Sequence, residues 1–303
     1  MSKRHIAGSG HDFFDLHRSN GMRELVVVGM AWDVTSSYRR GAAAGPDAIR
    51  SATSGRLYNQ FTEQGLDLAV HWRVCDHGNI RAKSMSKLKQ ILDVKVSLHN
   101  HQHPSMLFLG GDHFITYPTF RATAEAQKRS LSLLYFDAHP DLYEQYENKS
   151  FSHATVVSRI LEDRRLSSGS VCYVGIRAST MEQDHRIKHL GLAAHTTEDV
   201  YAKGCEAIAS SVMVTLQDAP VYLSLDLDCL DPAFAPGVGN PQPGGLSTRQ
   251  ITGILHGLQG LNIVAADIVE YCPKYDSDSK TTAFTTAILI KELMGLMAKS
   301  SIR

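Results

Sequence analysis

The sequence lacks an excess of charge of either sign, paired cysteines and a long hydrophobic run. Its 303 residues include 31 basic and 31 acidic ones, so no net field favours a nucleic-acid or membrane partner. The 5 cysteines contain no C-x-x-C pair, which argues against a disulfide framework and favours reduced thiols. The apolar run LVVVGMAW is too short to cross a bilayer. The N-terminus has no apolar core of a signal peptide, and we expect a cytoplasmic protein.

Short apolar runs alternate with helical patterns along the chain. The runs are apolar throughout and rich in β-formers, as expected of parallel strands covered on both faces; they span 24–32, 105–111, 131–139, 170–177, 220–228 and 261–270. Helical patterns span 86–100, 117–129, 197–216, 247–259 and 281–300, and Ser247 is a predicted N-cap. This alternation predicts a doubly wound α/β sheet.

The chain shows no composition break that would mark a linker. Residues 1–20 are polar and lack periodicity, so we expect residues 1–22 to form an N-terminal arm without regular structure. Residues 23–303 are expected to form one domain.

Candidate ligand residues follow four of the predicted strands. They are Asp112 and His113, then Asp137, His139 and Asp141, then Asp226 and Asp228, and finally Glu270. Ligands of open parallel sheets bind at the carboxyl ends of the strands, so these side chains should meet at one edge. Side chains at every second position of an extended segment point to one side, which predicts that Asp137, His139 and Asp141 converge before Pro140 ends the ladder.

So many buried carboxylates repel one another unless cations neutralise them. Two divalent ions are the simplest solution. An oxygen-rich ligand set with a few imidazoles suits Mn²⁺ better than Zn²⁺, while Ni²⁺, Co²⁺ and Fe²⁺ are also compatible. A D-x-D motif alone is usually a helix cap or a solvated loop, and GGDH alone could be a turn with an exposed histidine. Together with DAHPD, at successive strand ends, these motifs indicate a metal site. Asp231, before Pro232, is expected to anchor a turn.

The segments GGDHFITYP, FDAHPDLY, SHAT and SLDLDCLDPAFAPG resemble those of the agmatinase and arginase ureohydrolases. The segments WDVTSSYRRGAAAGPDAIR, PGGLSTRQ and DIVEYCPKYD are similar to other parts of the same family, with the closest match to agmatinases. The resemblance runs from about Arg23 to the C-terminus. It implies a three-layer α/β/α arginase-like fold with a central, mostly parallel sheet, assembled as a homo-oligomer, commonly a trimer or hexamer.

The same resemblance implies roles for eight residues. One metal ion would be held by His113, Asp137, Asp141 and Asp226, and the other by Asp137, His139, Asp226 and Asp228, so that Asp137 and Asp226 bridge the pair. Glu270 matches the carboxylate that pairs with the substrate guanidinium. His153, in SFSHAT, matches the histidine that shuttles a proton.

The chemistry of guanidinium hydrolysis agrees with these roles. A guanidinium is planar and permanently charged, and its resonance makes the carbon a poor electrophile. A metal-bound water has its pKa lowered to roughly 7, which supplies hydroxide to attack that carbon. Glu270 would orient the guanidinium through charge-assisted hydrogen bonds. His153 would give the leaving amine its proton, and urea and an amine would be released.

The sequence indicates the type of reaction more specifically than the substrate. Vertebrate-type arginases carry a serine-glycine-asparagine loop that grips the α-amino and α-carboxylate groups of arginine, and the segment EQYENKSFSHAT lacks it. This favours agmatine, converted to putrescine and urea. DAHPD, SHAT and DCLDPAFAPGV also resemble plant-type arginases, so arginine and 4-guanidinobutyrate stay as alternatives. Val238 and Asn240 replace threonines that many relatives carry near the substrate, and their effect on specificity stays open.

Two other classes of function are compatible with clustered acids and histidines. A binuclear metallophosphatase would also need cationic groups for phosphate, and no Gly-rich phosphate loop or basic cluster accompanies these motifs. A catalytically silent, metal-stabilised oligomer subunit would be expected to have lost a ligand or His153, and none is missing. Release of urea from a guanidino compound distinguishes the three classes.

Overall fold

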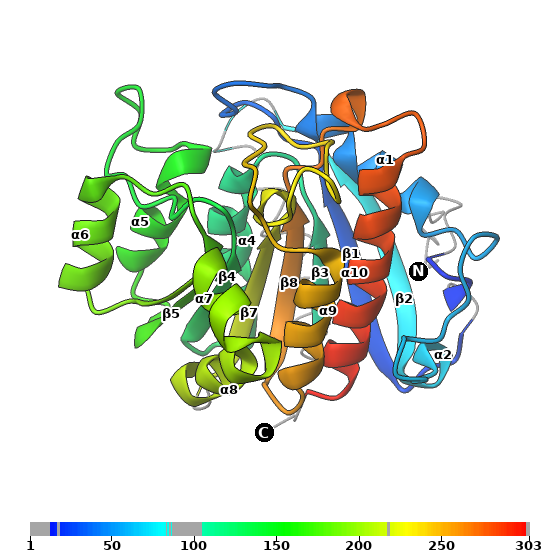
Figure 1. Ribbon diagram of the computed structural model, residues 1–303. Helices are drawn as coiled ribbons and strands as arrows, with labels where there is room; N and C mark the ends of the chain where they lie inside the picture. Colours follow the sequence, from blue (N-terminus) through cyan, green and yellow to red (C-terminus); the bar gives the residue numbers. More distant parts are fainter. Residues whose placement is uncertain are drawn as a thin grey trace.

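Eight parallel strands form one sheet at the centre of the computed structural model (Figure 1). The structure describes residues 13–16, 19–82, 84, 86, 105–216 and 219–300. The strand order is β2-β1-β3-β8-β7-β4-β5-β6, and every neighbouring pair is parallel. The strands are β1 (Arg23–Met30), β2 (Trp72–Ile80), β3 (Ser105–Leu109), β4 (Leu131–Phe136), β5 (Leu166–Ile176), β6 (Ala193–Thr196), β7 (Val221–Asp226) and β8 (Ile263–Val269). The predicted parallel α/β sheet is confirmed.

Six of these strands fall on the predicted apolar runs, and the two edge strands were not predicted. β2 reads WRVCDHGNI and is mostly half-buried, and β6 reads AAHT and is short and partly exposed. An edge strand has a neighbour on one side only, so its sequence need not be a continuous apolar run. The apolar pattern therefore detects the central strands and not the edges.

The helices and short 3-10 turns connect the strands on both faces. The helices are α1 (Gly45–Ala52), α2 (Leu68–His71), α4 (Thr116–Gln127), α5 (Val156–Leu161), α6 (Met181–His189), α7 (Thr197–Lys203), α8 (Cys205–Leu216), α9 (Thr248–Gly257) and α10 (Thr281–Ala298). Short 3-10 turns are η2 (Ala42–Ala44), η3 (His113–Ile115), η4 (His153–Thr155), η5 (Leu227–Cys229) and η6 (Pro273–Tyr275).

The helix predictions are largely confirmed, with one break. Ser247 caps α9 by accepting a hydrogen bond from the Gln250 N–H, while the Gln250 side chain bonds back to Ser247. The helix predicted over 197–216 is divided into α7 and α8 at Gly204, whose φ of 82° ends the first helix. The helix predicted over 86–100 lies outside the described residues.

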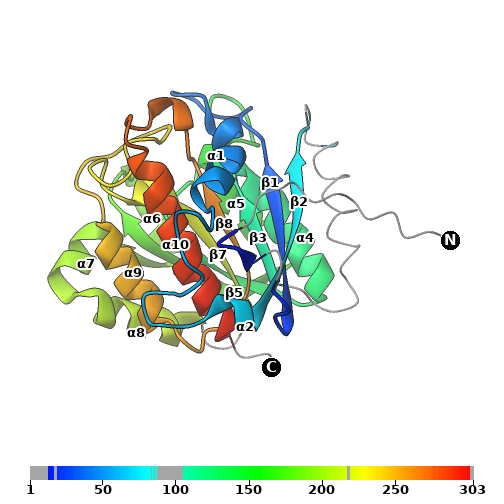
Figure 2. The ribbon, with the colours of Figure 1, turned by 90° about the vertical axis from the view of Figure 1, so that its right-hand side faces the viewer.

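The core consists of two apolar layers, one on each face of the sheet. Along β4, Leu134 and Phe136 enter one layer, and Leu133 and Tyr135 enter the other, because successive strand side chains alternate between faces. α1, α8, α9 and α10 cover the first layer, and α4 and α5 cover the second (Figures 1 and 2). The predicted three-layer α/β/α arrangement is confirmed.

α10 is a long apolar helix. Among the described residues it alone is long and apolar enough to cross a membrane by length and composition, yet 72% of it is buried inside the fold. It packs against α9 and α1, so its apolar character is explained by its place in the core.

Residues 13–16, which lie within the predicted N-terminal arm, pack against the domain. Phe13, Phe14 and Leu16 are fully buried in the same layer as α1, and the Phe14 N–H donates to the Thr53 carbonyl at 2.7 Å. The Phe14 ring also meets Tyr58 edge-on. The aromatic side chains of this segment carry enough apolar surface to hold it against the domain. Residues 1–12, which make up most of the predicted arm, lie outside the described part of the chain.

Candidate active site

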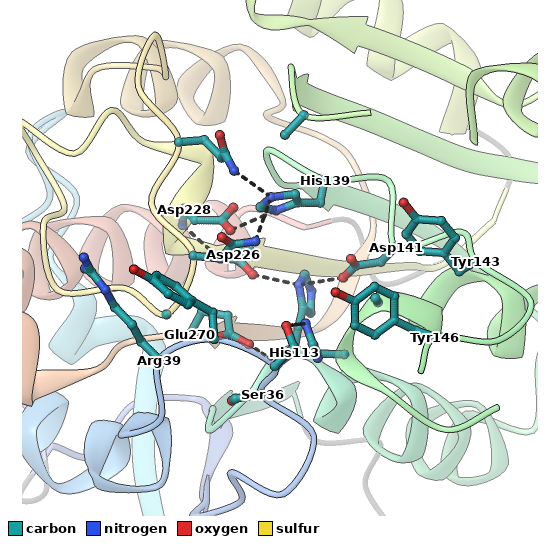
Figure 3. A pocket seen from close by; sticks show the side chains of 18 of the residues that line it. Ser36, Arg39, His113, His139, Asp141, Tyr143, Tyr146, Asp226, Asp228 and Glu270 are labelled. Atoms are coloured by element: carbon teal, nitrogen blue, oxygen red, sulfur yellow. Dashed lines mark hydrogen bonds and ion pairs between the residues drawn. The ribbon is translucent and has the colours of Figure 1, made fainter. Parts of the chain in front are cut away.

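Four adjacent strand ends bring the predicted ligand residues together at one edge of the sheet. In the order β3-β8-β7-β4, the strands lead into the side chains of His113, Glu270, Asp226 with Asp228, and Asp137 with His139 and Asp141. Figure 3 shows most of these side chains, with their polar ends directed toward a common pocket. The predicted convergence at the carboxyl edge is therefore found in the structure.

The local geometry of this convergence differs from the predicted one. β4 already ends at Phe136, so Asp137, His139 and Asp141 do not alternate along an extended strand. Asp141 has a φ of 47°, a left-handed conformation that turns its side chain back toward the site. Asp228 lies in the 3-10 turn η5 rather than on β7. Turns, rather than the strand repeat, aim these carboxylates.

His113 is surrounded by carboxylate oxygens at one ring nitrogen. Its Nδ1 lies 2.8 Å from Asp226 Oδ2, 3.0 Å from Asp137 Oδ2 and 3.5 Å from Asp141 Oδ2, and all four side chains are buried. One ring N–H cannot serve three acceptors, and Asp137 Oδ2 is buried without a hydrogen-bond partner. Such a set of converging donor atoms fits a divalent cation.

A second group of ligand atoms lies beside the first. His139 Nδ1 is 3.0 Å from Asp228 Oδ2 and 3.4 Å from Asp137 Oδ1. In each group, His113 with Asp137 and Asp141, and Asp137 with His139 and Asp228, the ligand atoms lie within 4.8 Å of one another and could hold a metal ion. Asp137 belongs to both groups, as a bridging ligand must.

Asp226, the other predicted bridge, joins the two groups in a different way. Its Oδ2 faces His113, and its Oδ1 accepts a hydrogen bond from the Asp228 backbone N–H at 2.7 Å. The carboxylate thus lies between a ligand of the first group and a ligand of the second.

The buried carboxylates of this cluster repel one another. Without bound cations, only protons can neutralise their charges. Burial and the charges of Asp228 and Asp137 raise the pKa of Asp226 well above its usual range, and burial and Asp137 do the same to the pKa of Asp141. Burial alone would lower the pKa of His113, but its contacts with Asp137 and Asp226 raise that pKa well above 6.5. Bound cations would replace these protons and remove the repulsion.

A buried relay behind His113 was missed by sequence reasoning. His113 Nε2 lies 2.9 Å from Ser224 Oγ, and the Ser224 hydroxyl donates to Asp267 Oδ1 at 2.7 Å. Asp267 is fully buried and also accepts from Tyr222 and Thr116. Because the relay engages Nε2, Nδ1 is the nitrogen available to a cation.

Tyr135 is a second supporting residue that sequence reasoning missed. Its hydroxyl donates to Asp141 Oδ2 at 2.8 Å, and its ring stacks on the His113 ring with centroids 4.6 Å apart. Tyr135 and Ser224 each stand two residues before a predicted ligand, Asp137 and Asp226. A polar group at that spacing on an otherwise apolar strand is the signal that could have identified them.

Glu270 lies beside the ligand cluster and faces the same pocket. Its Oε1 accepts a hydrogen bond from the His113 backbone N–H at 2.8 Å, and its own φ is 66°. A Cβ added at Gly239 would lie 2.9 Å from Glu270 Oε2, so glycine leaves room for this carboxylate. Burial and the nearby Asp112 raise the pKa of Glu270 well above its usual range.

His153 lies across the pocket, in the turn η4 that Ser152 caps. Its Nδ1 is 2.6 Å from the Thr35 carbonyl oxygen, and its Nε2 is 3.2 Å from Ser37 Oγ. The His153 ring meets the Tyr146 ring edge-on, whereas the neighbouring Phe151 packs on Phe114 and Tyr117.

The pocket above these residues has a volume of about 240 Å³. Its outer wall is formed by aromatic, amide, hydroxyl and cationic side chains, including Tyr143, Tyr146, Gln183, Asn240, Gln242, Ser37 and Arg39. Asn240 Nδ2 lies 3.1 Å from His139 Nε2, whereas Val238 is buried in the core. Asp231 accepts from the backbone N–H groups of Ala233, Gly244 and Gly245, which is the expected turn anchor.

Comparisons with known proteins agree with this fold and site. The family model described as "Arginase family" matches residues 23–295. Arginase 1, mitochondrial, of Oryza sativa subsp. indica is 35% identical over 284 residues, covering 90% of this chain and 81% of its own. The agmatinase of Chromobacterium violaceum is 34% identical over 285 residues, covering 92% and 85%. The crystal structure of a hypothetical agmatinase from Burkholderia thailandensis superposes with a TM-score of 0.83 at 32% identity, covering 92% of this chain and 87% of that one.

The fold and the relatives together define a hydrolase that acts on guanidino compounds. The chain belongs to the arginase family.

Proposed function

We propose that this protein hydrolyses agmatine to putrescine and urea, using two divalent cations, with Mn²⁺ the most suitable and Ni²⁺ or Co²⁺ compatible. The observation that carries the proposal is the pair of His/Asp groups that share Asp137. Members of both groups line one pocket, which a separate carboxylate, Glu270, also lines. We further propose that it works in the cytoplasm as a homo-oligomer, a trimer or hexamer.

Each charged group in the pocket has a distinct role in this proposal. His113, Asp137, Asp141 and Asp226 would hold one cation, and Asp137, His139, Asp226 and Asp228 the other. When bound, the cations would lower the pKa of a coordinated water and so supply the nucleophile at neutral pH. Glu270 would bind the planar guanidinium by charge-assisted hydrogen bonds and fix the orientation of its carbon.

His153 would move the proton that the leaving amine needs. Burial lowers the pKa of His153 below its usual range, which favours the neutral imidazole at neutral pH. The Thr35 carbonyl accepts from Nδ1–H, so the lone pair of the neutral ring is at Nε2. That atom would take up a proton in the pocket and deliver it to the departing nitrogen.

Agmatine is the first candidate substrate because the chain lacks the loop that grips the amino-acid end of arginine. Residues 144–152 form turns instead, with an antiparallel bridge between Tyr146 and Lys149. Relatives named agmatinase and arginase are similar to this chain at nearly equal identity. Sequence identity therefore does not distinguish the two substrates, and the side chains that line the pocket have to be considered instead.

One observation favours a second candidate, a guanidino compound with a carboxylate tail. The partly buried Arg39 lines the pocket and stacks on the rings of Tyr38 and Tyr275. Within the described residues no carboxylate lies within 4.0 Å of its guanidinium. Such a cation would repel the ammonium of agmatine and attract the carboxylate of arginine or 4-guanidinobutyrate.

Urea release from a panel of agmatine, arginine and 4-guanidinobutyrate tests both candidates. We expect agmatine to be the best substrate of the Mn²⁺-loaded protein, and Asp137→Ala to release no urea from any of them. Arg39→Gln should raise kcat/KM for agmatine relative to 4-guanidinobutyrate, whereas Arg40→Gln, on the exposed neighbour, should leave the ratio unchanged. Absence of urea from every compound would overturn the proposal, and a preference for an acid tail would favour the second candidate.

A further inference from the structure

Thr35 contacts His153 at two places. The His153 backbone N–H donates to Thr35 Oγ1 at 3.1 Å, and His153 Nδ1 lies 2.6 Å from the Thr35 carbonyl oxygen. A carbonyl oxygen can only accept, so Nδ1 must carry a hydrogen. Residue 35 thus determines which nitrogen of the neutral ring has the lone pair, although the two residues are 118 positions apart in the sequence.

Thr35 is itself held by a buried carboxylate. Both its N–H, at 2.8 Å, and its hydroxyl, at 2.9 Å, donate to Asp112 Oδ2. Asp112 is fully buried, and its own N–H donates to the Trp32 carbonyl at 2.8 Å. Since the single hydroxyl hydrogen of Thr35 goes to Asp112, Thr35 Oγ1 is left as the acceptor that the His153 N–H requires.

The loop that carries Thr35 is also fixed at its other end. Asp33 accepts from the Ser36 hydroxyl at 2.5 Å and from the Gly41 N–H at 2.6 Å. Ser37 Oγ then lies 3.2 Å from His153 Nε2, and Ser37 and His153 both line the pocket. The loop therefore accepts a hydrogen bond from His153 Nδ1 through the Thr35 carbonyl. It places Ser37, which lines the pocket, beside His153 Nε2.

We propose that Thr35 is a positioning residue, which holds His153 as the Nδ1–H tautomer with Nε2 directed into the pocket. The proposal rests on the proposed role of His153 in moving a proton. The proposal also assigns a role to Asp112. This carboxylate is not an assigned ligand of metal or substrate, but it accepts hydrogen bonds from Thr35, in the loop that orients the histidine.

Replacement of the hydroxyl tests the kinetic part of the proposal. Thr35→Val keeps the shape of the side chain and removes the acceptor of the His153 N–H. We expect kcat to fall by at least about tenfold with KM within about twofold, since the loss concerns proton transfer rather than substrate binding. Thr35→Ser restores the hydroxyl and should recover most of kcat. Thr123→Val, which removes a buried hydroxyl bonded inside α4, is the matched control and should leave kcat unchanged.

A double-mutant cycle separates positioning from a general structural effect. If Thr35 acts through His153, then Thr35→Val should change kcat by less than about twofold in the His153→Ala background. A fall by the same factor in both backgrounds would overturn the proposal, as would an unchanged kcat in the single Thr35→Val variant. Metal content and melting temperature, measured on each variant, identify a loss that comes from misfolding.

An observation of the ring itself distinguishes failure of this proposal from failure of the proposed function. In ¹⁵N-histidine-labelled protein loaded with diamagnetic Mg²⁺, the His153 resonance, assigned by its absence from His153→Ala, should report Nδ1–H with an unprotonated Nε2. Thr35→Val keeps the backbone carbonyl but loses the hydroxyl bonds to Asp112 and to the His153 N–H that hold this carbonyl against the ring, so the ring should shift toward a mixture of tautomers. An Nε2–H tautomer in the wild-type protein would overturn the positioning role, whether or not the protein releases urea.

Discussion

The backbone N–H of His113 donates a hydrogen bond to Glu270 Oε1 at 2.8 Å. His113 thus offers its ring to the cluster of carboxylates and its backbone to the one acid assigned to the substrate. The two residues follow β3 and β8, which are paired in the sheet through Leu109 and Ile268. The separation between the candidate metal site and Glu270, the carboxylate proposed to bind the guanidinium, is therefore set by two neighbouring strands.

This arrangement predicts that Glu270→Gln loses activity without losing metal. Gln keeps the shape, and its amide oxygen can still accept from the His113 N–H, but the negative charge that binds the guanidinium is gone. We expect urea release to fall by about 10²-fold or more, as for loss of a group that stabilises charge in the transition state. Metal analysis should still find both ions.

Glu292→Gln is a suitable control for this variant, because Glu292 is also buried but lies with His256 away from the pocket. Near-normal urea production by Glu270→Gln would mean that the guanidinium is held elsewhere.

Metal content should distinguish bridging from single-site ligands. Asp137→Ala and Asp226→Ala should each empty both sites, because each carboxylate is assigned to both ions. His113→Ala should lower occupancy mainly at one site. Elemental analysis of the purified variants measures this directly, and two tightly held ions in Asp226→Ala would refute its assignment as a bridge.

Removal of the metal should destabilise the fold. The buried carboxylates of the cluster repel one another when no cation is bound, and ions that bind only the folded state stabilise it. A site held at 100 times its Kd contributes about 2.7 kcal/mol, so chelation should lower Tm by several degrees and added Mn²⁺ should restore it. Asp137→Ala should show little response to chelator. An unchanged wild-type Tm after confirmed metal loss would count against a clustered buried site.

The pH dependence of turnover should reveal His153. Burial lowers the pKa of this histidine, and its neutral form is the one that can take up a proton at Nε2. Turnover should therefore fall as the pH decreases through that pKa, below the usual value of about 6.5. His153→Ala should lower kcat by roughly 10²–10⁴ with metal content intact, and the acidic limb set by His153 should disappear. A variant that keeps the full rate and the same profile would show that another group moves the proton.

The apolar runs predicted the central strands because burial on both faces requires them to be apolar throughout. β2 and β6 were not predicted, because edge strands are only partly covered and their sequences are not continuous apolar runs. The buried Phe13 and Phe14 lie in a segment without helical or strand periodicity. Their burial in the same core layer as α1 is visible only in the tertiary structure.

The sequence by itself determined which residue types stand at the strand ends, since a carboxylate or imidazole directly after an apolar strand is visible in the printed letters. Only the tertiary structure decided which atoms meet. The order of the strands places His113 beside Glu270, 157 residues later, and a left-handed turn at Asp141 aims its carboxylate. Contacts such as that of Thr35 with His153 depend on the approach of two loops from distant strands. No local pattern encodes that approach, because it arises from packing the whole sheet.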